Sequence, residues 1–184
     1  YKVSAPFWFS LSYSTRQNII YYETYKNFID RLLEEESRQG YQLQVNYRPM
    51  KKLSLGATGG YRFRKSDERP SKNLYTYASY SQIPGINASA TLSATFLETS
   101  YLNGSIYGLT ISRNIYKNKI NSSLGYRYVD YRFSFSDFGQ KQHLIEISMN
   151  CKLLQKLSCG IYYEVTFEKD NMLNRLNLQL VQRF

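Results

Sequence analysis

The stretch 53–64 reads LSLGATGGYRFR, and its residues alternate in chemical character at every step. Apolar and aromatic residues, with one glycine, occupy the odd positions from Leu53 to Phe63. Serine, threonine, glycine and arginine occupy the even positions from Ser54 to Arg64. Successive side chains of a β-strand point to opposite faces of a sheet. The stretch therefore predicts a strand with one apolar face and one polar face.

The same alternation recurs along most of the chain and predicts an all-β protein. We expect ten antiparallel strands at about 7–14, 41–48, 53–64, 74–82, 87–96, 107–111, 119–134, 145–153, 157–167 and 175–184. Most are about ten residues long, which suits a tilted strand that crosses a bilayer. In the seventh strand the apolar parity slips between Tyr128 and Tyr131, and this slip predicts a β-bulge.

Composition excludes several classes of protein. The mean hydropathy is −0.50, and no apolar run approaches the roughly 18–20 residues of a membrane helix. A transmembrane β-barrel remains compatible, because only half of its strand residues face lipid. The net charge is +10, but lysine and arginine are scattered over turns and strand ends. We therefore expect no nucleic-acid partner.

Aromatic residues and cysteines also inform the fold. The chain has 19 Tyr and 10 Phe, and Tyr41 and Tyr47 bracket one predicted strand. Tyrosine at both strand ends is typical of the two interfaces of a membrane. Two cysteines are too few for a disulfide-rich scaffold. Cys151 and Cys159 fall on the apolar parity of neighbouring strands, where we expect two free, lipid-facing thiols.

The predicted connections alternate in length along the chain. Tight turns are expected at 48–52, 82–86, 114–118 and 153–156, and longer polar loops at 15–40, 65–73, 97–104, 134–142 and 168–173. Short turns at one end and long loops at the other are typical of outer-membrane barrels. Ten strands place the C-terminus at the short-turn end.

The first long loop, 15–40, has a helical pattern instead of alternation. Apolar residues recur at spacings of three and four from Tyr21 to Leu33, and Gly40 is a plausible stop. We expect a helix over about 18–38 in an extracellular loop. It would rest on the rim of the barrel, fold into the lumen or meet a protein partner.

The last ten residues, RLNLQLVQRF, carry the most specific motif. Apolar residues at every second position lead to a final aromatic, with the set Leu176, Leu178, Leu180 and Phe184. This strand resembles the terminal strand of bacterial outer-membrane β-barrel proteins, in which it is the assembly signal read by the barrel-insertion machinery. The resemblance implies an antiparallel up-and-down transmembrane barrel in the outer membrane, with lipid and that machinery as partners. A soluble β-sandwich with one wet face is the alternative fold.

We expect residues 1–184 to form a single outer-membrane barrel domain. The chain begins at Tyr1 without a signal segment. We therefore expect either a complete small barrel or the C-terminal part of a larger one.

The polar parity gathers charged residues from four consecutive predicted strands. We expect a lumen charge network of Arg127, Arg132, Glu146, Glu164, Arg175 and Arg183, with Arg132 roughly opposite Glu146. A charge on the lipid face would cost about 2–4 kcal/mol at the midplane, so the polar face must be interior. Such a network could close the lumen with paired charges, line a pore that favours anions, or bind a partner or ligand.

The single histidine, His143, is the one candidate for catalysis. Outer-membrane lipid hydrolases have a serine two residues after the histidine, where this chain has Ile145. Outer-membrane proteases of ten strands use acidic pairs with a histidine, but Asp130 and Asp137 form no adjacent pair. We therefore expect no catalytic residues, and no metal or cofactor.

The leading functional prediction is non-enzymatic. It is an outer-membrane barrel with a polar, arginine-rich interior that acts in transport, pore formation or surface binding. The alternatives are an outer-membrane hydrolase that uses His143 and a barrel that anchors a protein partner.

Overall fold

A computed structural model describes residues 2–4, 6–14, 40–62, 70–116, 119–136, 139–154, 157–169 and 171–182. These residues form one antiparallel sheet with an up-and-down strand order. Its strands are β1 (Lys2–Ser4), β2 (Phe7–Ser14), β3 (Gly40–Met50), β4 (Leu53–Arg62), β5 (Ser71–Tyr80), β6 (Ala88–Glu98), β7 (Leu102–Ile115), β8 (Ile120–Phe133), β9 (Gly139–Leu154), β10 (Leu157–Phe167) and β11 (Met172–Gln182). The predicted all-β, antiparallel, up-and-down architecture is confirmed.

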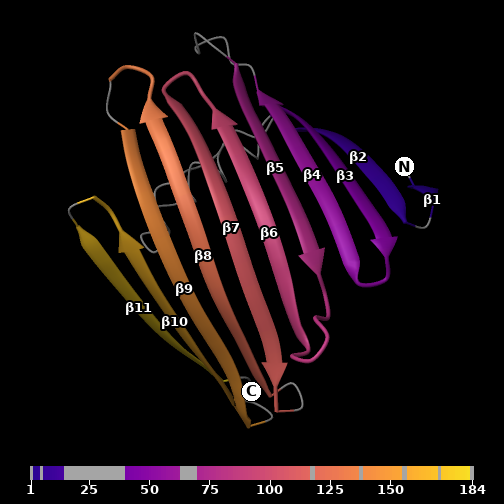
Figure 1. Cartoon of the computed structure of the whole chain (residues 1–184), viewed down its shortest axis with the longest axis vertical. Helices are drawn as coiled ribbons and strands as arrows, with labels where there is room; N and C mark the ends of the chain where they lie inside the picture. The colour runs from indigo at the N-terminus through magenta and orange to yellow at the C-terminus, as the bar shows by residue number, and fades with distance from the viewer. Residues whose placement is uncertain are drawn as a thin grey trace.

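The sheet is strongly curved. Figure 1 shows β5 to β8 nearest the viewer, while β1 and β2 on one side and β10 and β11 on the other recede. Each strand pairs with its neighbour in sequence, and no pairing joins the first and last strands within the described ranges. The described part is therefore an open curved sheet, and the expected closure into a barrel is not seen in it.

The expected helix over 18–38, the residues Arg183 and Phe184, and Asp137 all lie outside the described residues. The part of the chain that the structure describes contains strands and turns. No helix among those residues is long and apolar enough to cross a membrane.

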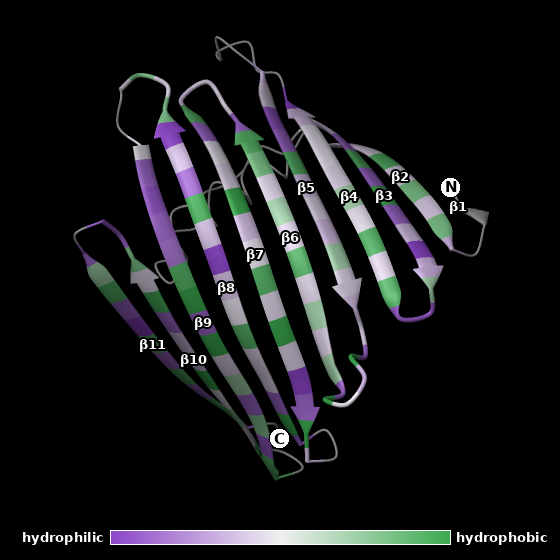
Figure 2. Ribbon diagram, viewed as in Figure 1, coloured by the Kyte–Doolittle hydropathy of each residue, from purple (hydrophilic) through white to green (hydrophobic). Residues whose placement is uncertain are grey.

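Strand register assigns every side chain to one of two faces. The row Leu55, Ala78, Leu92, Leu109, Tyr126 and Ile145 runs across β4 to β9 on one face. One residue further along, Ser54, Ser79 and Thr91 run across the other face. We call these the apolar face and the polar face. Figure 2 shows the resulting alternation of hydropathy along the strands.

The apolar face is the outward one and stays largely exposed. Leu92, Leu124 and Leu178 have exposed fractions of 59%, 51% and 70%. Among the described residues no large side chain is fully buried, although a soluble domain of this size buries many. The sheet thus carries its large apolar side chains outside and its polar ones on the inner, concave side.

Two predictions about connections and bulges are wrong. The connection expected at 97–104 is a short turn, because β6 runs to Glu98 and β7 starts at Leu102. The hydroxyl of Thr99 accepts hydrogen bonds from the backbone N–H groups of Tyr101 (3.3 Å) and Leu102 (2.9 Å), which closes this turn. The bulge expected between Tyr128 and Tyr131 is absent, because β8 pairs continuously with both β7 and β9 there.

The apparent slip in parity has a different cause. Near the loop end of β8, Val129 and Tyr131 lie on the polar face, where they pack with Leu97, Leu102 and Leu144 in the only core cluster of buried residues among those described. Asp130 and Arg132 lie on the other face. Near the loop end of β8, apolar side chains therefore lie on the polar face and charged side chains on the apolar face, although the backbone register is unchanged.

Candidate functional site

The polar face carries a cluster of four charged residues, one from each of the last four strands. We call Arg127 of β8, Glu146 of β9, Glu164 of β10 and Arg175 of β11 the charge cluster. Arg127 pairs with Glu146, and its Nη2 lies 3.9 Å from Oε2 of Glu164. Arg175 Nη1 lies 3.8 Å from Oε1 of the same carboxylate. Two arginines and two glutamates therefore form a balanced network.

Glu164 is the centre of the charge cluster. Its side chain is 4% exposed, so its charge is tolerated only with partners that replace water. Besides the two arginines, the hydroxyl of Tyr162 donates a hydrogen bond of 2.7 Å to Oε2 of Glu164. Tyr162 was not among the predicted site residues. Its position two residues before Glu164, on the same face of one strand, is the signal that could have identified it.

A glycine makes room for the neighbouring carboxylate. Gly125 lies directly opposite Glu146 in the register of β8 and β9. A Cβ at Gly125 would lie 3.4 Å from Oε2 of Glu146. The space above this glycine lets the glutamate side chain lie over β8, toward Arg127.

Apart from Arg62 at the loop end of β4, which donates a hydrogen bond of 3.2 Å to the hydroxyl of Ser71, the rest of the polar face over β4 to β7 is made of small or uncharged side chains. Ser89 and Ser112 share a hydrogen bond of 2.7 Å across β6 and β7, and Thr91 donates one of 2.9 Å to Ser79. The hydroxyl of Tyr77 donates a hydrogen bond of 2.5 Å to Oδ1 of Asn46. A charged wall on β8 to β11 thus faces inward beside a hydroxyl-rich wall whose one charged side chain among the described residues is Arg62.

The structure brings together four of the six predicted lumen charges. Arg127, Glu146, Glu164 and Arg175 lie within one network, as described above. Arg132 is wrongly predicted, because it shares a face with Asp130 and Tyr128 and pairs in register with Gly139. Its expected position opposite Glu146 came from counting back from a loop at 134–142, whereas β9 already starts at Gly139. Arg183 lies outside the described residues.

The predicted assembly-signal residues lie in a regular strand. Leu176, Leu178 and Leu180 project from the apolar face of β11 with exposed fractions of 60%, 70% and 68%. Their role in assembly stays a prediction, as does that of Phe184.

The apolar face bears a row of rings near the loop end. Phe96 and Tyr107 meet edge to face with centroids 6.0 Å apart, Tyr107 stacks on Tyr128 at 6.5 Å, and Tyr128 lies 5.1 Å from the ring of His143. We call these four residues the aromatic row. His143 also forms a hydrogen bond of 2.7 Å through Nδ1 with the hydroxyl of Tyr126. The described partners of His143 are thus aromatic side chains of the apolar face.

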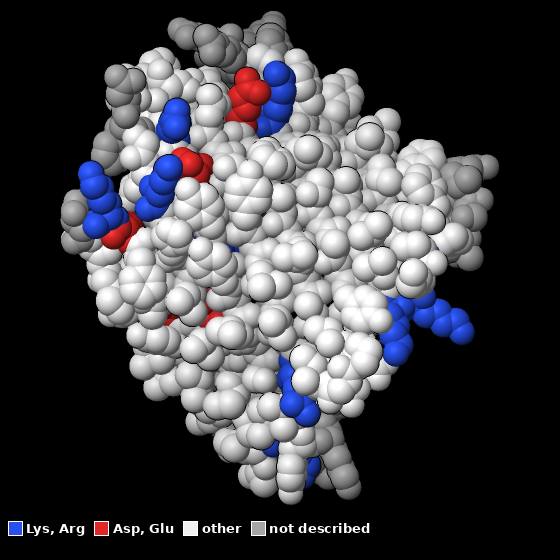
Figure 3. All heavy atoms as spheres, viewed as in Figure 1, with Lys and Arg blue, Asp and Glu red and all other residues white. Residues whose placement is uncertain are grey.

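Charged side chains of the apolar face gather at the two ends of the strands. Figure 3 shows blue and red groups near the loop end of this face and blue groups near the opposite end, with an almost uncharged band between them. At the loop end the ion pairs are Lys72 with Glu98 (3.6 Å) and Lys141 with Asp130 (3.8 Å).

The described residues offer no metal-binding group, and comparison with known proteins gives no match. In the described ranges no group of three or more His, Cys, Asp or Glu side chains could hold a metal ion. No protein-family model matches the chain, and neither the curated proteins nor the solved structures searched contain a match.

Proposed function

We propose that this chain is a bacterial outer-membrane β-barrel protein whose polar face lines a water-filled path for transport or pore formation. The observation that carries the proposal is the chemical inversion of the sheet. Large apolar side chains cover the outer, convex face in an uncharged band bounded by charged residues, and ion pairs and hydroxyls occupy the concave face. Lipid is the environment that such an outer face suits.

The size of the apolar band agrees with a membrane. On β8 it extends from Tyr128 to Ile120, which is roughly 26 Å along a strand and roughly 20 Å in depth at a tilt of about 40°. Outer-membrane barrels have an apolar band about 25 Å tall.

The slant of the band supports tilted strands. On β4 the apolar band begins at Tyr61, which is in the same register row as Gly139 of β9. On β9 the band begins at His143, four residues further along the strand. That slip is roughly 13 Å over five strand spacings of roughly 24 Å in all, which corresponds to a tilt of roughly 30°. Barrel strands tilt by typically 35–45°.

The charge cluster supports a weakly selective path. Arg132 lies on the apolar face, so the polar face has one arginine fewer than we expected. The charge cluster consists of two arginines and two glutamates, whose charges balance. We therefore propose small polar solutes and ions of both signs as cargo. The location of His143 among the rings of the apolar face supports this non-enzymatic function over a hydrolase.

Reconstitution in planar bilayers tests the proposal. We expect ion conductance with little preference for anions or cations. Glu164→Gln should shift the reversal potential toward anion preference, and Arg175→Gln toward cation preference, because each variant unbalances the charged wall. Folded, inserted protein without conductance would contradict the pore and favour a binding or anchoring role.

A further inference from the structure

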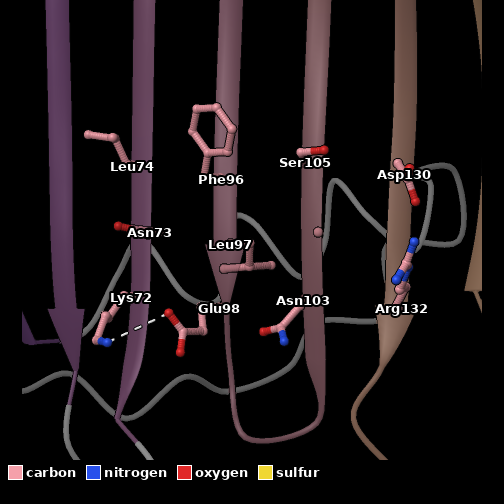
Figure 4. A pocket seen from close by; sticks show the side chains of 11 residues that line it. Lys72, Asn73, Leu74, Phe96, Leu97, Glu98, Asn103, Ser105, Asp130 and Arg132 are labelled. Carbon is pink, nitrogen blue, oxygen red and sulfur yellow. Dashed lines mark ion pairs between the residues drawn. The ribbon is translucent and has the colours of Figure 1, made fainter. Parts of the chain in front are cut away.

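A shallow groove of about 550 Å³ lies on the apolar face at the loop end, across β5 to β8. Figure 4 shows Lys72, Glu98, Asn103, Ser105, Asp130 and Arg132 along this groove, with Phe96 beside them. It is a polar site on the outward face, and Phe96 of the aromatic row is one of the residues that line it.

Most charges of the groove already have partners. Lys72 is paired with Glu98 at 3.6 Å, and Asp130 with Lys141 at 3.8 Å. Arg132 is exposed, and the described residues provide no carboxylate within ion-pair distance of it. Arg132 is thus the cation of the groove whose charge is available to an external anion.

The backbone opposite Arg132 accommodates its side chain. Arg132 faces Gly139 in the register of β8 and β9, and a Cβ at Gly139 would lie 3.1 Å from Cγ of Arg132. Because glycine has no side chain there, the stem of the arginine lies close to β9. A guanidinium group offers several N–H donors in a planar fork that matches phosphate oxygens.

Further hydrogen-bond donors lie on the neighbouring strand. Asn103 pairs in register with Arg132, and Ser105 with Asp130. On the side of the groove away from the loops lie the exposed rings of Phe96 and Tyr107 (43% and 45%), followed by Leu92 and Leu109 on the apolar band. From the loop end to the centre, Arg132 and Asn103 share the first register row, Ser105 and Phe96 lie in the second, Tyr107 in the third, and Leu92 and Leu109 in the fourth.

We infer that this groove binds the phosphate of an anionic membrane lipid. Arg132 would bind the phosphate oxygens, and Asn103 and Ser105 would donate hydrogen bonds to them. The acyl chains would run along Phe96 and Tyr107 onto the aliphatic band. This inference rests on the proposed membrane location, since only there do a lipid phosphate and its chains meet the face in this order.

Native mass spectrometry of the full chain in detergent tests the inference. The probes are dioleoylphosphatidylglycerol, dioleoylglycerol with the same chains but no phosphate, and inorganic phosphate. We expect one phosphatidylglycerol to bind preferentially and about ten-fold more weakly to Arg132→Gln, since a charge-assisted hydrogen bond is lost. Arg132→Lys should fall between the two. Arg48→Gln, at the opposite strand end, is the matched control and should bind like the wild type.

Three outcomes would overturn the inference. The first is equal binding of phosphatidylglycerol by the wild type and Arg132→Gln, with both proteins folded by circular dichroism. The second is equal binding of the two lipids by the wild type, and the third is displacement of the lipid by millimolar inorganic phosphate. Flotation of the wild type with vesicles after an alkaline wash separates the failures: absence of flotation would refute the membrane location itself, whereas flotation with unchanged Arg132→Gln binding would refute only the lipid site.

Discussion

Leu92→Lys tests the assignment of the apolar face through stability. Leu92 lies near the middle of the band on β6, four residues from Phe96, or roughly 13 Å along the strand. Ala78 and Leu109 flank it in register. If lipid covers this face, a lysine there should cost about 2–4 kcal/mol in the free energy of unfolding, or roughly 30- to 1,000-fold in the folding equilibrium.

The same substitution has a different consequence in water. Leu92 is 59% exposed, so a soluble protein would lose less than about 0.5 kcal/mol. The matched variant is Ser93→Lys on the polar face, where Gly108 lies opposite in register and a lysine can reach water. Urea unfolding of both variants in lipid vesicles gives the comparison. Equal effects of the two substitutions, or a loss below 0.5 kcal/mol for Leu92→Lys, would refute the assignment of the faces.

Three further predictions concern assembly, thiols and the charge cluster. Deletion of Phe184 should lower outer-membrane assembly and leave the chain in the periplasm, measured as the fraction of heat-modifiable folded protein; wild-type levels would contradict the assembly signal. Cys151 and Cys159, which are free and face each other in register, should both be alkylated in the unfolded, unreduced protein, and an intact mass without added groups would show a disulfide instead. Glu164→Gln should destabilise the sheet by about 3 kcal/mol, because it leaves two arginines without their shared carboxylate, and a loss below 1 kcal/mol in urea unfolding would contradict the central role of Glu164.

Period-two alternation predicted the strands well because register and burial both follow it. The predicted strand at 119–134 corresponds to β8 at Ile120–Phe133, and 157–167 matches β10 at Leu157–Phe167. Alternation also placed four cluster charges on one face, since parity is conserved along an unbroken strand.

The same rule failed where the chemistry of the faces changes. In the sequence, only apolar character assigns a residue to one face of the sheet. Val129 and Tyr131 therefore suggest a bulge, and the bulge places Arg132 on the wrong face. Near the loop end an outward residue no longer has to be apolar, and Leu97 and Leu144 provide an apolar inner neighbourhood. These partners come from other strands, and only the register between strands could reveal them. Loop lengths failed similarly at Thr99, where a side-chain hydrogen bond closes a short turn.

Collision accessibility of nitroxide spin labels is the most direct test of which face meets lipid. Single labels at Leu92, Leu124, Ser93 and Ser123, in a background with both native cysteines replaced by alanine, would be measured by electron paramagnetic resonance in vesicles. We predict that labels at Leu92 and Leu124 collide mainly with oxygen, which concentrates in lipid, and those at Ser93 and Ser123 mainly with a water-soluble nickel chelate. Similar nickel accessibility at all four positions would contradict the lipid-facing assignment and with it the proposed membrane barrel.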